Sequence, residues 1–66
     1  MQIRVNGKMR EVAEGITLSE LLTHLNVHPL RVAMQLNTEI VKRARYGEVV
    51  VKEGDVVEIL TFMAGG

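Results

Sequence analysis

The chain has 66 residues, with eight lysines and arginines, eight aspartates and glutamates, and no cysteine. At this length only one small core can form, so we expect a single domain with no room for a separate cofactor domain. The balanced charge argues against nucleic acid or anionic lipid as partners, which leaves proteins. The missing cysteine excludes disulfides, thiolate metal sites and a sulfur nucleophile of the chain's own.

Membrane and secretion signals are also missing from the sequence. No stretch approaches the roughly 20 apolar residues of a membrane span. Residues 1–7 lack the apolar run that is typical of a signal peptide. We therefore expect a cytoplasmic protein. We also expect it to be monomeric when free.

The first predicted element is a β-hairpin. Ile3 and Val5 alternate with polar residues, and residues 8–12 supply a second extended segment. Between them, Asn6 and Gly7 suit the two positive-φ positions of a type I′ turn.

A short helix is predicted to begin at Leu18. The Thr17 hydroxyl can accept a hydrogen bond from the amide of Glu20 while the Glu20 carboxylate reaches back to Thr17, which makes a capping box. Asn26 suits the left-handed position after a helix, and Pro29 prevents continuation. The leucines at i, i+3, i+4 and i+7 form one stripe that would pack on a sheet: Leu18, Leu21, Leu22 and Leu25.

Two strands and a less regular stretch follow the helix. Residues 32–36 alternate and end at the turn-prone Asn37-Thr38, after which Ile40-Val41 forms a brief strand. Residues 42–47 have no clean periodicity and are predicted to be a loop or a single helical turn. Residues 49–51 are expected to be a short extended piece.

A final strand over residues 56–62 is apolar on both faces, which is unusual for an edge strand. Val57 and Ile59 point one way, whereas Leu60 and Phe62 point the other. Because one helix covers only one face, Leu60 and Phe62 can form an exposed partner-binding patch beside Met63. The alternative is that they complete the core, and the sequence leaves both possibilities open.

These elements predict an α+β fold, a small mixed sheet with one main helix on one face. We expect a domain over residues 1–62 and a flexible tail over residues 63–66 that ends in a diglycine. Without Cβ atoms, Gly65 and Gly66 can pass through a channel too narrow for side chains. An extended tail reaches on the order of 10 Å, enough to place the Gly66 carboxylate in another protein's active site.

Several short motifs are distributed over the whole chain: Asn6-Gly7, residues 17–25, Arg31-Val32-Ala33, residues 36–41, Arg43, Tyr46, Glu53-Gly54-Asp55, Val57-Glu58-Ile59 and Ala64-Gly65-Gly66. Together they resemble the ThiS family, the sulfur carriers of thiamine biosynthesis. The resemblance implies a ubiquitin-like β-grasp fold. Lys42 departs from the proline that family members often carry before the arginine, which affects only the local loop.

The resemblance also implies a chemistry. A partner, a ThiF-like E1-type adenylyltransferase, would convert the Gly66 carboxylate into a glycyl adenylate, with Ala64, Gly65 and Gly66 threaded into its active site. A persulfide derived from a cysteine desulfurase would then yield a Gly66 thiocarboxylate, a thioglycine. Thiazole synthase would use that sulfur for the thiazole ring of thiamine. The chain would be a protein co-substrate and not an enzyme.

The sequence agrees that the nucleotide must be bound by a partner. The glycines before the tail are isolated, so no phosphate-binding loop can hold a triphosphate, and ATP with magnesium would be supplied by the partner. His24 and His28 have the spacing of a helical metal pair, but the helix is expected to end before His28, so we predict no metal site. With only Tyr46 and Phe62 as aromatics, stacking on nucleic acid has little support.

Two alternatives share the terminal diglycine. The small subunit of molybdopterin synthase uses the same fold and activation chemistry, although that family usually runs longer. A ubiquitin-like modifier would instead join Gly66 to lysines of other proteins. Two terminal glycines also arise by chance in about one chain in 200, given average glycine usage.

Overall fold

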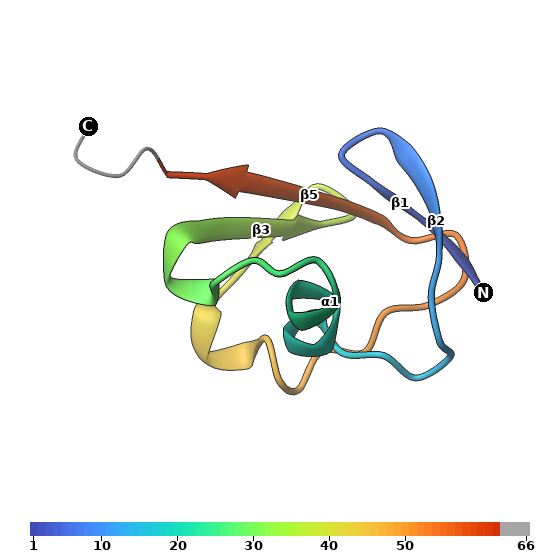
Figure 1. Cartoon of the computed structure of the whole chain (residues 1–66), viewed down its shortest axis with the longest axis horizontal. Coiled ribbons are helices and arrows are strands. Elements are labelled where there is room, and N and C mark those ends of the chain that lie inside the picture. The colour runs from blue at the N-terminus through green and yellow to red at the C-terminus, as the bar shows by residue number, and fades with distance from the viewer. Residues whose placement is uncertain (63–66) are drawn as a thin grey trace.

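The computed structural model describes residues 1–62 and shows a five-stranded sheet with one α-helix and two short 3₁₀-helices in that range (Figure 1). The predictions for residues 63–66 lie outside the described residues. The strands are β1 (Gln2–Val5), β2 (Lys8–Glu11), β3 (Val32–Leu36), β4 (Glu39–Val41) and β5 (Val56–Thr61), and the helices are α1 (Leu18–His24), η1 (Pro29–Arg31) and η2 (Arg43–Arg45).

The last strand is the central strand of the sheet. The order is β2-β1-β5-β3-β4, with β5 parallel to β1 and antiparallel to β3. Helix α1 lies across one face of this sheet (Figure 1). The prediction of an α+β mixed sheet with its main helix on one face is therefore confirmed, and the two-sided apolar pattern of the last strand is explained by its central place.

Both predicted turns between neighbouring strands form. Asn6 has φ 49° and Gly7 has φ 82°, as a type I′ turn requires. Asn37 and Thr38 repeat the pattern between β3 and β4 with φ 51° and 75°. The sheet therefore has two tight hairpins, one on each side of β5.

Helix α1 begins and ends where the sequence predicts. The Glu20 amide donates to the Thr17 hydroxyl at 3.1 Å, and the Thr17 amide donates to the Glu20 carboxylate at 2.9 Å. These bonds satisfy two amides that a helix start leaves without partners. Asn26, with φ 58°, turns the chain out of the helix after Leu25. The capping box and the helix end are confirmed.

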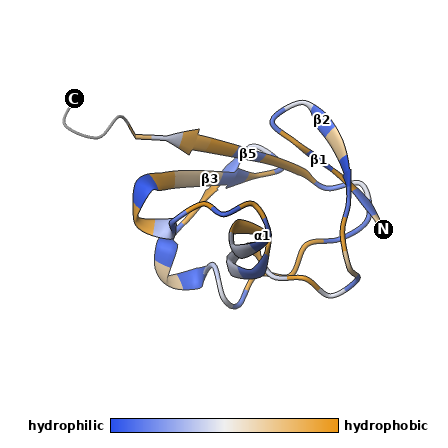
Figure 2. Ribbon diagram, in the orientation of Figure 1, coloured by the Kyte–Doolittle hydropathy of each residue, from blue (hydrophilic) through white to orange (hydrophobic). Residues whose placement is uncertain are grey.

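The core lies between α1 and the covered face of the sheet. Three helix leucines contribute, whereas Leu25 is only partly buried. Figure 2 shows β5 coloured hydrophobic along most of its length. The buried apolar residues are Ile3, Val5, Ile16, Leu18, Leu21, Leu22, Val32, Met34, Tyr46, Val51, Val57 and Ile59.

The stretch that the sequence left undecided closes one side of this core. Residues 43–45 form the single 3₁₀ turn η2, and Tyr46 behind it is buried with 3% exposure. Val50 pairs with Thr17 in one isolated bridge, and the Leu18 amide donates to the Val49 carbonyl at 3.1 Å. The expected extended piece is therefore a single bridge to the start of α1. No helix within residues 1–62 is long and apolar enough to cross a membrane.

Candidate functional site at the end of β5

The predicted reactive group lies just beyond the described residues. Met63, Ala64, Gly65 and Gly66 fall outside them, so the tail and Gly66 stay predictions. The structure describes where that segment begins, at Phe62 directly after β5. The site is therefore characterised by how β5 is held and by what surrounds its end.

Strand β3 supports β5 up to its end. Val32 pairs with Thr61 and Ala33 pairs with Leu60. One residue beyond the strand, the Phe62 amide donates to the Arg31 carbonyl at 2.8 Å. The backbone is therefore hydrogen-bonded up to Phe62, from which the tail continues.

The Asn6 side chain supports β5 from the other side. The backbone amides of Arg4 and Asn6 donate to the carbonyls of Asp55 and Val57, each at 2.9 Å. At Ile59, where β1 has already turned away, the Asn6 side chain replaces the missing strand. Its Oδ1 accepts from the Ile59 amide at 2.7 Å, and its Nδ2 donates to the Ile59 carbonyl at 3.2 Å.

The sequence predicted Asn6 only as a turn residue and missed this second role. An asparagine amide presents one donor and one acceptor, as a backbone peptide group does, so it can pair with a strand. Asn37 in the other hairpin acts similarly, since its Oδ1 accepts from the Val56 amide at 2.9 Å. No signal in the sequence indicates either bond, because the partners lie 53 and 19 positions away.

The face of the sheet away from α1 carries exposed apolar side chains. Leu60 is 52% exposed and Phe62 is 53% exposed, so neither completes the core. Of the two alternatives that the sequence left open, the structure agrees with an exposed surface; that it binds partners stays a prediction. Strand register adds further exposed residues on this side, and the open-face patch consists of Met9, Ile40, Val56, Leu60 and Phe62.

Polar residues interrupt this patch. Arg4 lies between Met9 and Val56 in register, and Gln35 lies between Ile40 and Glu58. The end of β5 has no such interruption, because Leu60 is paired with Ala33. The apolar part of the open face is therefore most continuous beside the start of the tail.

The histidines that have metal-ligand spacing have different positions in the structure. His24 is the last residue of α1, whereas the His28 Nδ1 accepts from the Leu30 amide at 3.1 Å and caps η1. Within residues 1–62, no group of three or more His, Cys, Asp or Glu side chains is arranged to hold a metal ion.

At the end of the sheet far from the end of β5, two ionisable groups have clearly shifted pKa values, and within residues 1–62 they are the only ones. The Met1 ammonium donates to a Glu11 carboxylate oxygen at 2.9 Å. This hydrogen bond raises the pKa of the ammonium and lowers the pKa of the Glu11 carboxyl. The pair closes the hairpin at its open end, far along the strand from the Asn6 turn.

The sequence and the fold of this chain both match known proteins. The model of the ThiS family matches residues 3–66, which is nearly the whole chain. The chain belongs to the ThiS family. The family prediction made from the sequence is confirmed.

Individual relatives of the ThiS family agree with this assignment. The sulfur carrier protein ThiS of Escherichia coli is 33% identical over 66 residues, which cover 100% of both chains. A crystal structure of the thiamine biosynthesis protein ThiS from Geobacter metallireducens superposes with a TM-score of 0.86 at 42% identity and covers 100% of both chains. The ubiquitin-like β-grasp fold is therefore confirmed.

Other relatives are longer proteins that contain a ThiS-like segment. A thiazole synthase of Paramagnetospirillum magneticum is 38% identical to this chain over all 66 residues, and one of Magnetococcus marinus is 39% identical. The chain spans only 20% of the length of each.

Proposed function

We propose that this chain is the sulfur carrier for the thiazole ring of thiamine, a protein co-substrate and not a catalyst. The observation that carries the proposal is the full-length match to the Escherichia coli sulfur carrier, which runs through the terminal Ala64-Gly65-Gly66. A central β5 that leads directly into that tail supports it.

The chemistry acts on the Gly66 carboxylate, which must first become a better acyl donor. In the adenylyltransferase, a carboxylate oxygen attacks the α-phosphorus of ATP, pyrophosphate leaves, and a glycyl adenylate forms. The terminal sulfur of a persulfide then attacks the acyl carbon and AMP leaves, which produces an acyl persulfide. A thiol cleaves its sulfur–sulfur bond, so a disulfide forms and the Gly66 thiocarboxylate is released.

Each reagent other than Gly66 belongs to a partner in this proposal. The E1-type adenylyltransferase, ThiF-like in the family, binds ATP and magnesium, and a cysteine-desulfurase-derived persulfide supplies sulfur. The carrier itself binds no cofactor. The cytoplasm is the proposed location, because persulfides and thiols persist in reducing compartments.

Thiazole synthase is the proposed acceptor of the sulfur. The two thiazole synthases that contain a segment similar to this chain support that link, because the same segment occurs there within the acceptor's own polypeptide. The open-face patch, which includes Phe62, is the proposed docking surface for both the adenylyltransferase and thiazole synthase. Its exposed apolar residues fit a surface that becomes covered in a complex.

Two rival functions make different products. A molybdopterin synthase small subunit would form the same thiocarboxylate but donate its sulfur to a different acceptor. A ubiquitin-like modifier would form isopeptide adducts of high mass. The relatives named as ThiS favour the thiazole pathway over both.

Intact-mass measurement after co-expression with the adenylyltransferase and sulfur donor tests the proposal. We expect the exchange of one oxygen for sulfur at Gly66, and thiazole formation when thiazole synthase and its other substrates are added. Deletion of Gly66, or addition of one alanine after it, should abolish both, because the reactive carboxylate is then lost or replaced.

The same variants should retain the fold, since neither changes residues 1–62. Circular dichroism and the thermal midpoint, Tm, provide that control. Thiazole formation that continues undiminished with the alanine-capped chain would refute the proposal.

A further inference from the structure

The basic residues of this neutral chain are unevenly distributed around the end of β5. Four of the eight lysines and arginines lie in η1 and η2 or next to them: Arg31, Lys42, Arg43 and Arg45, which we call the tail-root cluster. The Arg31 carbonyl accepts from the Phe62 amide at 2.8 Å. The Arg43 Nε donates to the Pro29 carbonyl at 3.1 Å, which joins η2 to η1. Arg31 is therefore bonded directly to the residue before the tail, and Arg43 is bonded to the short helix that contains Arg31.

Two carboxylates flank this cluster: Glu48 pairs with Arg45, and Glu39 lines a shallow hollow together with Lys42 and Arg45. Arg45 lies 3.5 Å from Glu48, and both side chains are more than 60% exposed, so this pair is weak. Within residues 1–62, no carboxylate lies within 4.0 Å of the charged groups of Arg31, Lys42 or Arg43.

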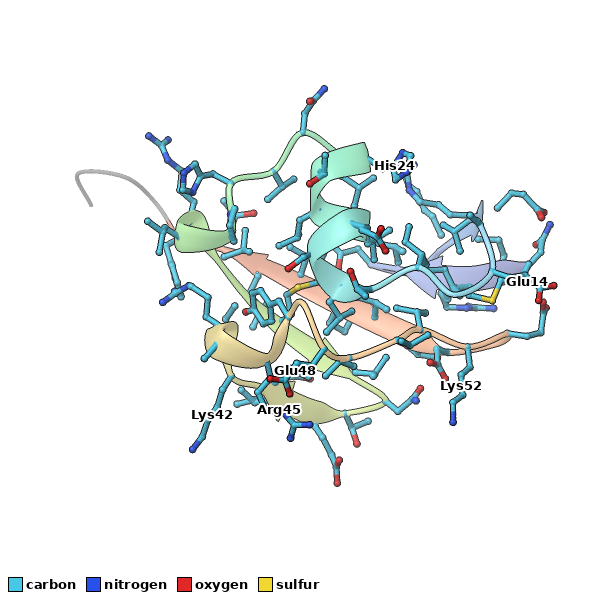
Figure 3. All side chains as sticks on the ribbon, turned by 90° about the horizontal axis from the view of Figure 1, so that it is seen from below. Glu14, His24, Lys42, Arg45, Glu48 and Lys52 are labelled. Carbon is cyan, nitrogen blue, oxygen red and sulfur yellow. The ribbon has the colours of Figure 1, made fainter. Side chains whose placement is uncertain are left out.

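The acidic groups at the other end of the molecule are bonded within the chain and lie near the basic residue Lys52. A Glu53 carboxylate oxygen accepts from the Gln2 amide at 3.1 Å, and Asp55 accepts from the Lys52 amide at 2.8 Å. Figure 3 shows Lys42, Arg45 and Glu48 beside η2, and Glu14 and Lys52 towards the opposite end. The neutral chain therefore has a local excess of positive charge at η1 and η2, where four cations are flanked by the two carboxylates Glu39 and Glu48.

We infer that the tail-root cluster docks against a carboxylate-rich surface around the entrance through which the adenylyltransferase takes in the tail. This inference rests on the proposed function. Four residues span at most about 14 Å when fully extended, so a partner that reaches Gly66 must approach Phe62 within that distance. The tail-root cluster, joined to Phe62 through the Arg31 carbonyl, is then close to the rim of the partner's channel, where carboxylates would complement its charge.

A cluster of this kind acts mainly on the rate of association. Complementary charge at the rim of an interface raises the association rate constant by one to three orders of magnitude and is screened by salt. The open-face patch supplies apolar area, and the cluster supplies orientation with the tail towards the partner. We expect removal of three cations to slow association about tenfold at low salt.

Stopped-flow association with the adenylyltransferase that activates the wild-type chain tests the inference. The test variant is Arg31→Gln/Lys42→Gln/Arg43→Gln, and the matched control is Lys8→Gln/Arg10→Gln/Lys52→Gln, which removes the same charge from β2 and from the turn before β5 and leaves η1 and η2 unchanged. Because Arg43 donates to the Pro29 carbonyl, the double variant Arg31→Gln/Lys42→Gln serves where the triple variant is unfolded.

We expect about tenfold slower association for the test variant at about 50 mM NaCl, less than about twofold for the control, and equal rates for all chains near 500 mM. Equal slowing in test and control, or slowing that salt does not remove, overturns the inference. If the wild-type chain acquires sulfur while the rates are equal, the proposed function stands and only the docking surface is wrong. If the wild-type chain is never activated, both are overturned.

Discussion

The two ends of the sheet use their polar groups in opposite ways. At the end that holds the N-terminus, Glu11, Glu53 and Asp55 accept hydrogen bonds from the ammonium or from backbone amides. At the end where β5 finishes, the backbone is hydrogen-bonded up to Phe62, but the side chains of Leu60, Phe62 and Arg31 are exposed.

This difference distinguishes the groups that stabilise the fold from the groups that a partner can bind. Groups that bond within the chain hold the sheet together, whereas exposed apolar and cationic groups contribute little to folding and are available to a partner. At the end of β5, the backbone is hydrogen-bonded by β3 on one side and by Asn6 on the other, whereas the side chains are exposed. A carrier with the proposed role, which offers its tail to several enzymes, would benefit from this combination of a fixed strand end and an exposed surface.

The largest change in stability is expected from loss of the hydrogen bonds between the Asn6 side chain and Ile59, which support β5 near its end. Asn6→Gly keeps the positive φ of the turn but removes both side-chain bonds to Ile59, and we expect a loss of about 1–3 kcal/mol in the free energy of unfolding. Urea unfolding measures it. Thr38→Gly is the control in the other hairpin, because Thr38 also has a positive φ, 75°, but its side chain makes no hydrogen bond within residues 1–62. An Asn6→Gly variant as stable as wild type would show that the Asn6 bonds contribute nothing.

A binding change without a stability change is expected at Phe62. Phe62→Glu should weaken binding to the adenylyltransferase and to thiazole synthase about tenfold or more, because a charge replaces an apolar contact. The free energy of unfolding should change by less than about 0.5 kcal/mol, since the side chain is 53% exposed.

Val50→Glu is the control for this experiment, because Val50 is 46% exposed but pairs with Thr17 away from the open face. Isothermal titration calorimetry compares the wild-type chain with both variants. Unchanged affinity of the Phe62→Glu variant for both partners would exclude the end of β5 from the interface.

The smallest effect is expected at the N-terminal end, from the pair between Met1 and Glu11. The lowered pKa of Glu11 means that its contribution exists above the ordinary value of 4.5 and disappears as the pH falls through the folded value. The raised pKa of the ammonium means that its contribution exists below 8.0 and disappears as the pH rises through the folded value. The pair therefore stabilises the fold between these limits.

Tm measurements at about pH 3, pH 6 and pH 10 check this window. Glu11→Gln should lower Tm slightly at pH 6 and much less at the two extremes, and high salt should shrink the difference. Glu39→Gln, which removes the same charge from an exposed position in β4, is the control. A Tm difference that does not depend on pH would contradict the ionic origin of the effect.

The sequence by itself determined the local elements and the family. The Asn6-Gly7 turn, the start of α1 at Thr17 and its end at Asn26 follow from backbone preferences and caps that involve residues at most a few positions apart. Alternation showed which residues of β5 point together. The diglycine and the chain-wide resemblance predicted the ThiS family, and the comparisons confirmed it.

Only the tertiary structure decided which segments meet across the sheet. The sequence could not show whether Leu60 and Phe62 are buried, because that depends on which face α1 covers. It could not show that Asn6 pairs with Ile59, or that Arg31 and Arg43 gather at the end of β5, because these contacts join segments far apart in the chain. Local preferences act over a few residues, whereas the parallel pairing of β1 with β5 is set by the packing of the whole core.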